Sequence, residues 1–219
     1  MLRFAEEITL LSLNDETGVM HRNVSRRSYD YAIAGALIME LAFLNRLDTD
    51  AEHIIMLKDM PAGDPLLDEA LKILSGMDEN PPITAAIEVL AARSASFEPR
   101  IFAALVHKGI LEEREKRFLW MKGERTYPVI DGKEETEVLT RIRMTVLAED
   151  AIPDPQDVAI IALMEATKLH RVVFLRDELS RCRRRIHQLA QMDFIGQGIA
   201  NALDKAAGII EEPEAAAES

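Results

Sequence analysis

The chain of 219 residues carries 26 Lys and Arg against 38 Asp and Glu, which gives a formal net charge of −12. This balance disfavours broad nucleic-acid binding, because a protein that lies along nucleic acid needs a basic surface to displace the phosphate counterions. Cys182 is the only cysteine, which excludes an intrachain disulfide bond and a thiolate-rich zinc site.

The first residues predict a helix and a cytoplasmic location. Residues 2–13 repeat apolar side chains at helical spacing, and residues 14–18 contain the Asn, Asp and Gly that are typical of a turn. Glu6 and Glu7 stand where a signal peptide would have its apolar stretch. We therefore expect a cytoplasmic protein that contacts a membrane only peripherally, at its inner face.

The most apolar segment, residues 29–47, predicts a buried central helix. Within it, residues 31–44 have Glu40 as their only charged residue, and their apolar side chains point to every side of a helix. A helix that is apolar on all sides is buried in a core or in a membrane, and this segment is too short to span a membrane. Ser28 is the predicted N-cap, and Asn45 is expected to end the helix in a left-handed conformation.

Further helices are predicted along the rest of the chain. Asp64 followed by Pro65 starts a helix that stops at Gly76, and Asn80-Pro81-Pro82 opens another. The later helices are expected after Pro99 as far as Gly109, and then at residues 134–149, 155–175, 177–192 and 194–208. The acidic tail, residues 209–219, is predicted to be disordered, so one domain spans residues 1–208.

Two short hairpins are predicted, at residues 47–59 and 117–130. Each follows a helix that ends in Asn or Gly and a leucine, and each continues through a charged turn into an apolar strand. A helix followed by a β-wing is the outline of a winged-helix unit, so a regulatory or nucleic-acid-binding module is one alternative. Two similar helix ends in an α-rich domain would explain the pattern equally well.

The second hairpin predicts self-association. Phe118 and Trp120 project to one face of its first strand, and Tyr127 lies on the opposing strand. A two-stranded hairpin is marginal alone in water, and only one of its faces can rest on the helices. We therefore expect a homo-oligomer formed through Phe118, Trp120 and Tyr127. The alternative is that the helix after Gly132 folds back over the second face.

No motif for catalysis, a metal or a cofactor is found. The five histidines include no pair four residues apart with an intervening Glu. Gly196 and Gly198 lack the third glycine and the preceding strand of a dinucleotide-binding turn. Glu134 and Glu135 stand in the first turn of a predicted helix, where the helix dipole explains them. We therefore expect no enzyme activity, no cofactor and no metal site.

Basic residues gather in a few places despite the negative net charge. Three arginines precede the central helix, near its positive end, and two more flank a break between helices. Arg181 and residues 183–185 crowd one short helix. Each group could be a solvated charged face, or it could bind an anionic surface such as lipid head groups. The candidate lipid-binding residues are Arg22, Arg26, Arg27, Arg93 and Arg100.

Several segments, taken in order, resemble the Golgi phosphoprotein 3 family. The sequence Gly-Asp-Pro-Leu-Leu-Asp-Glu-Ala-Leu at residues 63–71 looks like that family's signature, and other matches lie at residues 4–13, 36–47, 105–111 and 185–189. The resemblance implies one mainly α domain, with amphipathic helices around a hydrophobic central helix and a protruding β-hairpin used in self-association. It also implies a peripheral membrane protein that binds phosphatidylinositol 4-phosphate and the cytosolic tails of glycosyltransferases.

The positions that would bind the lipid differ from the family's pattern. The family's pocket uses a tryptophan and an arginine where this chain has Ser25 and Ala34, and two further arginines where it has Ala95 and Glu98. The resemblance therefore implies that the specific pocket is lost. The short N-terminal region resembles that of bacterial, prokaryote-type members, in which Golgi sorting cannot be the role.

We therefore expect a non-catalytic protein that resembles phosphatidylinositol 4-phosphate-binding adaptors and contacts anionic lipids by charge. An oligomerising protein–protein adaptor without lipid binding is a further alternative, and binding to nucleic acid is not expected.

Overall fold

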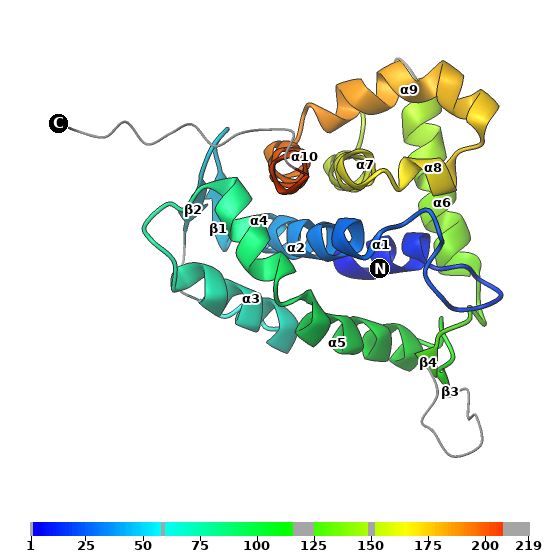
Figure 1. Ribbon diagram of the computed structural model, residues 1–219, viewed down its shortest axis with the longest axis horizontal. Helices are drawn as coiled ribbons and strands as arrows, with labels where there is room; N and C mark the ends of the chain where they lie inside the picture. The colour runs from blue at the N-terminus through cyan, green and yellow to red at the C-terminus, as the bar shows by residue number, and fades with distance from the viewer. Residues whose placement is uncertain (1, 58–59, 116–124, 149–151, 208–219) are drawn as a thin grey trace.

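The computed structural model of the chain describes residues 2–57, 60–115, 125–148 and 152–207 (Figure 1). Within these residues the fold class predicted from the sequence is confirmed: it is a single mainly α domain with two small antiparallel hairpins. In chain order the elements are α1 (Phe4–Ser12), α2 (Arg26–Phe43), β1 (Leu47–Thr49), β2 (Ile54–Met56), α3 (Pro65–Ser75), α4 (Ile83–Ala91), α5 (Ser94–His107), β3 (Arg114–Glu115), β4 (Arg125–Thr126), α6 (Lys133–Leu147), α7 (Pro155–Thr167), α8 (His170–Val173), α9 (Arg176–Ala190) and α10 (Phe194–Ala206).

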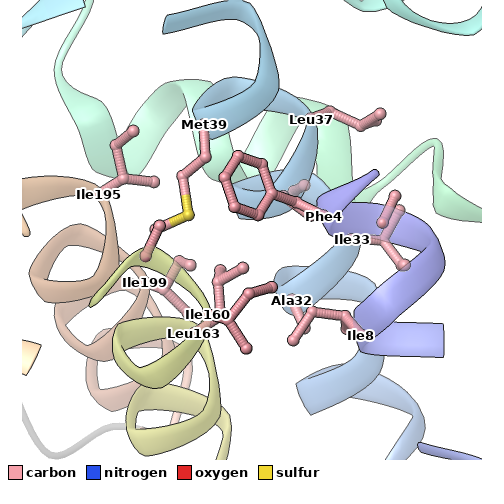
Figure 2. Packing of buried hydrophobic residues seen from close by; sticks show 14 of the residues in the cluster. Phe4, Ile8, Ala32, Ile33, Leu37, Met39, Ile160, Leu163, Ile195 and Ile199 are labelled. Carbon is pink, nitrogen blue, oxygen red and sulfur yellow. The ribbon is translucent and has the colours of Figure 1, made fainter. Parts of the chain in front are cut away.

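The predicted central helix is confirmed as α2, which other helices surround. Every residue from Ala32 to Met39 is buried, and α1, α3, α4, α5, α7 and α10 all pack against α2. Figure 2 shows apolar side chains from α1, α7 and α10 meeting those of α2, with Phe4 and Ile8 on one side and Ile160, Leu163, Ile195 and Ile199 on the other. Because α2 is apolar all round, it is stable only with helices on every side.

The central helix begins three residues earlier than predicted, and its N-cap is Ser25 instead of Ser28. Ser25 has an extended backbone, and its side-chain oxygen accepts the amide of Ser28 at 3.0 Å. An N-cap serine satisfies one of the free amides of the first turn in this way. Arg26 and Arg27 are consequently the first two helical residues.

The ends of α2 and α5 have the same geometry, which accounts for the repeated helix–hairpin pattern. Asn45 and Gly109 both have positive φ, 54° and 74°. The amide of the next residue then donates to a carbonyl five residues before it, at 2.9 Å after α2 and 3.1 Å after α5. This is the hydrogen bond of a Schellman helix ending. The prediction that Asn45 ends the central helix is thereby confirmed.

Two helix starts were predicted correctly and two helix limits were wrong. Asp64 and Asp154 each accept backbone amides of the first turn. By contrast, α5 begins at Ser94 and passes through Pro99, whose missing N–H leaves the carbonyl of Ala95 without its helical partner. Ala95 is exposed, so water can bond that carbonyl. The predicted helix 155–175 is two helices, because Lys168 adopts a left-handed conformation with φ 63°.

The first hairpin is confirmed, and the second is described only in part. Strands β1 and β2 pair in antiparallel register from Leu47 opposite Met56 to Thr49 opposite Ile54. Strands β3 and β4 pair through Arg114 opposite Thr126, and Leu111 lies opposite Val129, so the second hairpin begins before the predicted residue 117. The apolar strand that was predicted to carry Phe118 and Trp120 lies outside the described residues, as do the acidic tail and its boundary with the domain.

Tyr127 is the one predicted self-association residue that the structure describes. Its ring stacks on that of Phe102 with 4.0 Å between the ring centroids, and its amide donates to the carbonyl of Gly18 at 2.9 Å. Gly18 has φ +63°, and a Cβ there would lie 2.1 Å from the backbone nitrogen of Pro128. The base of the second hairpin is thus fixed to the turn after α1, and self-association stays a prediction.

Gly196 and Gly198, which do not form a dinucleotide-binding turn, lie where α10 packs closely on its neighbours. A Cβ at Gly196 would lie 2.5 Å from the Cβ of Ala162 on α7, and one at Gly198 would lie 2.3 Å from the Ile83 side chain of α4. Gly35 of α2 plays the same part opposite Ile199. Small residues at these positions let α10 approach the central helix closely enough for dense packing.

We predict that Gly196→Ala destabilises the protein although alanine favours helix more than glycine does. The added methyl group would meet a Cβ and a backbone that cannot move alone, and overpacking of this kind costs typically about 1–3 kcal/mol. Urea unfolding followed by circular dichroism measures the effect. The control is Gly132→Ala, where a Cβ would meet no atom within 4 Å. Equal stability of the two variants would contradict the close approach.

Candidate functional site

The candidate lipid-binding arginines do not form one cluster. Arg26, at the start of α2, is held by three partners: its Nε lies 2.8 Å from Asp30, its Nη1 donates to Glu98 at 2.8 Å, and its Nη2 donates to Ser94 at 3.2 Å. Ser94 in turn hydrogen-bonds to Asp30. Two carboxylates of the same chain therefore compensate the Arg26 guanidinium.

The start of α5 supplies half of this network because of where that helix begins. Ser94 is its first residue and Glu98 follows one turn later, so both side chains face the N-terminal end of α2. Below them, Arg26 lies over the ring of Tyr29 at 5.6 Å, and the Tyr29 hydroxyl lies 3.0 Å from that of Thr9 in the core. Burial raises the pKa of Tyr29 well above its usual value, so that this hydroxyl stays neutral.

The other four candidate arginines divide into one that is paired and three that are free of ion pairs. Arg100 of α5 lies 2.5 Å from Glu69 of α3, well away from the start of α2. Arg27 and Arg93 donate only to backbone carbonyls, of Ala206 and Val89, each at 3.1 Å. Arg22 is exposed, and within the described residues none of the three forms an ion pair.

A crevice beside Arg27 joins four elements that are distant in sequence. It has a volume of about 390 Å³ and is lined by the N-terminal turn of α2 and by residues of α7, α9 and α10, with Arg27, Lys168 and His187 among them. Glu165 and Asp204 also line it, so its charges are mixed. No local pattern in the sequence predicts this crevice, because its lining residues come from four separate helices.

A buried ion cluster ties α1 to α6 and α7. Arg141 donates to Glu7 at 2.8 Å and to Asp157, which also accepts the hydroxyl of Thr145 at 2.8 Å. The side chains of Glu7 and Asp157 are 5% and 4% exposed. Burial raises the pKa of Glu7, and the hydrogen bond from Arg141 opposes that shift. Because each carboxylate has a cationic partner, we interpret the cluster as structural.

Glu40, near the C-terminal end of the central helix, also has a structural partner. Its Oε2 accepts the amide of Phe4 at 3.1 Å and so caps the first turn of α1. Burial raises the pKa of Glu40, and the hydrogen bond from Phe4 lowers it in part. The carboxylate also lines a cavity of about 210 Å³ between α1, α2, α3 and α5, whose floor includes Leu37 and Leu67.

Glu134 and Glu135 stand in the first turn of a helix, α6, as predicted. Burial and the neighbouring carboxylate of Asp15 raise the pKa of Glu135 to about 7, whereas the dipole of the first turn of α6 would lower it. Asp15 is held close because its carbonyl accepts the amide of Val129 at 3.0 Å. With this raised pKa, Glu135 keeps a proton at a pH where an exposed glutamate has lost it.

The described parts of the chain contain no group of three or more His, Cys, Asp or Glu side chains that could hold a metal ion. Across residues 2–57, 60–115, 125–148 and 152–207, no helix is both long enough and apolar enough to cross a lipid bilayer.

Comparison with known proteins agrees with the resemblance seen in the sequence. A family model described as Golgi phosphoprotein 3 (GPP34) matches residues 4–206. The Vacuolar protein sorting-associated protein 74 of Schizosaccharomyces pombe is 27% identical over 162 residues, which are 64% of this chain and 47% of that protein. The protein of the same name from Eremothecium gossypii is 26% identical over 164 residues, 64% of this chain and 48% of its own length. The chain thus spans about half the length of these curated relatives.

Removal of Arg141 should destabilise the fold strongly. Arg141→Met would leave Glu7 and Asp157 buried without a cation, and breaking a buried pair from one side costs about 3–5 kcal/mol. Chemical unfolding at pH 7 measures the loss. Lys133→Met on the same helix is the matched control, because the Lys133 side chain is 85% exposed. A loss below about 1 kcal/mol for Arg141→Met would show that the cluster does not anchor α1.

The Glu135–Asp15 pair predicts a pH dependence of stability. Between the usual glutamate pKa and about 7, the folded protein keeps a proton that the unfolded chain has lost, so this contribution is full below that window and disappears as pH rises through about 7. Glu135→Gln should therefore flatten the fall in the free energy of unfolding between pH 5 and pH 8. Glu137→Gln, an exposed position of α6, should keep the wild-type slope. Identical slopes for all three proteins would refute the raised pKa of Glu135.

Proposed function

Because this chain belongs to the Golgi phosphoprotein 3 family, we propose that it is a non-catalytic protein that binds anionic membrane surfaces peripherally. It does so by charge, without a pocket for one head group. The observation that carries this proposal is the pairing of Arg26, because Asp30 and Glu98 hold its guanidinium within the protein. Other exposed arginines keep their charge available to a partner.

The network around Arg26 supports the loss of head-group selectivity. A phosphoinositide pocket needs converging cations that meet the phosphate oxygens, usually arginines in bidentate geometry. Beside Arg26, a phosphate would meet the carboxylates of Asp30 and Glu98, which already pair with that arginine. Glu98 stands at a position where the family resemblance places an arginine. Repulsion between phosphate and carboxylates therefore disfavours a specific site.

Charge-driven binding to a bilayer needs only exposed cations. Arg22, Arg27 and Arg93 are exposed and carry no ion pair within the described residues. Each basic residue close to an anionic surface contributes roughly 1 kcal/mol, and the attraction falls off within a Debye length. Binding of this kind depends on the total lipid charge and on salt, and it distinguishes poorly between head groups.

The winged-helix alternative is less well supported by the first hairpin. The side chains of Leu47 and Ile54 are buried, and the amide of Ile54 donates to the carbonyl of Pro81 at 2.9 Å. A hairpin fixed in this way to the start of α4 is not free to enter a groove of nucleic acid. The net charge of −12 argues in the same direction.

The lipid preference is tested with vesicles of matched charge. We expect the full chain to sediment with phosphatidylcholine vesicles that contain phosphatidylserine, and to bind phosphatidylinositol 4-phosphate no better at equal total charge. Binding should weaken when the salt concentration rises from 50 to 200 mM, and Arg26→Gln should leave it unchanged, because Arg26 is already paired.

Two outcomes would overturn the proposal. One is the absence of binding to any anionic vesicle at low salt. The other is a strong preference for phosphatidylinositol 4-phosphate that Arg26→Gln abolishes, which would show that Arg26 leaves its carboxylates to build a specific pocket.

A further inference from the structure

The strongest positive charge of the chain lies on α9 and the turn before it, away from the candidate arginines of α2. Residues 168–188 contain seven of the 26 Lys and Arg but only two of the 38 Asp and Glu. We call their exposed side chains the α9 face; they are Lys168, Arg171, Arg176, Arg181, Arg183 and Arg184. In a chain of net charge −12, this concentration of positive charge is local and one-sided.

Helix geometry explains why these charges point outward. Cys182, Ile186 and Leu189 are buried at helical spacing and form the inner side of α9, which packs on α6 and α7. Arg181 and Arg184, three residues apart, therefore share the opposite side. Figure 1 shows α9 lying across the outer edge of the helical domain, at the end opposite to β3 and β4.

Glu165 lies near Arg183 of the α9 face, and its Oε2 lies 2.9 Å from Nδ1 of His170. The two acidic residues within residues 168–188 do not neutralise the face. Glu178 forms an ion pair with Arg143 of α6, and it accepts the amide of Leu175 at 3.0 Å. Its charge is thus compensated from beneath the helix, and Asp177 is the one remaining carboxylate of residues 168–188. Among the described residues, none of the six cations of the α9 face forms an ion pair.

Exposed apolar side chains stand at both ends of α9. Leu175, immediately before the helix, is 72% exposed, and Met192, shortly after it, is 63% exposed. On the adjoining helix α6, Met144 and Leu147 are also exposed. Apolar side chains beside a row of arginines suit a lipid surface, where the cations meet head groups and the apolar groups enter the interfacial layer. A polynucleotide would leave these apolar side chains in water.

The α9 face continues toward the start of the central helix. Lys168 lines the same crevice as Arg27 of α2 and His187 of α9. The unpaired Arg27 therefore lies at the border of the α9 face, whereas the paired Arg26 does not line this crevice.

We propose that the α9 face is the surface through which the protein docks on an anionic lipid bilayer. This inference rests on the proposed function and assigns it to a particular face. The bilayer supplies the negative charge that complements the arginines, and α9 lies flat against it. A fifteen-residue helix is about 22 Å long, so its arginines contact several head groups at once.

The test compares two triple variants with the same loss of charge. Arg176, Arg181 and Arg184 are changed to Gln in one; Lys72, Arg125 and Lys133, which are exposed on α3, β4 and α6, are changed to Gln in the other. Each cation at an anionic surface strengthens binding about fivefold. We therefore expect the α9 variant to bind phosphatidylserine-containing vesicles about 100-fold more weakly, and the control variant to change less than about threefold.

A third variant separates charge from shape and guards against misfolding. Arg176, Arg181 and Arg184 changed together to Lys should keep most of the binding, since a bilayer responds to charge more than to guanidinium geometry. Circular dichroism should show the same helical content and melting temperature for all variants, because the changed side chains are exposed.

The outcomes distinguish the inference from the function on which it rests. If the wild type binds no anionic vesicle, both fail. If the wild type binds but the two Gln variants lose binding equally, the α9 assignment fails while charge-driven binding stands. If the wild type binds duplex DNA more tightly than vesicles at the same salt concentration, and the α9 variant abolishes that binding, the face is a nucleic-acid site and the inference is overturned.

Discussion

The burial of α2 is the constraint on which the rest of the structure depends. From Ala32 to Met39 the helix has no side toward solvent, so neighbouring helices must cover its whole circumference. Gly35 lets Ile199 of α10 approach one side, while Ile8 of α1 packs on another. Because burial of polar groups is costly, a helix enclosed in this way carries its charged side chains near its two ends. Arg26 and Arg27 lie at one end and Glu40 near the other, and each is bound by groups from other elements.

The same constraint places acidic residues inside the domain. Helix α1 is buried along its whole length, although it carries Glu6 and Glu7. Lys108 lies 2.6 Å from Glu6, and Arg141 binds Glu7. Buried ion pairs of this kind add little net stability, because desolvation offsets their attraction, yet removing one partner is costly. They therefore act chiefly to fix how α1 meets α5 and α6.

Whether an arginine of this chain is ion-paired or exposed depends on which carboxylates lie near it. Arg26 begins α2 beside Asp30 and faces Glu98 of α5, so carboxylates of the same chain compensate its charge. The arginines of α9 have one side of their helix buried and their neighbour Glu178 already bound to Arg143. An acidic protein can thus keep a basic face available for an anionic surface without forming a head-group pocket.

Local patterns in the sequence determined the fold class, the enclosed central helix, the starts at Asp64 and Asp154 and the endings at Asn45 and Gly109, because each depends on residues a few positions apart. The candidate site was predictable only in part. The sequence indicated that arginines precede the central helix, but only tertiary packing decided that Arg26 pairs with two carboxylates whereas Arg27 donates to the carbonyl of Ala206. The same holds for Arg141, which meets Glu7 across 134 positions of sequence, and for the pKa of Glu135, which burial and Asp15 raise. Partners so distant are brought together by the packing of helices around α2, and no local periodicity records which side chains will then be neighbours.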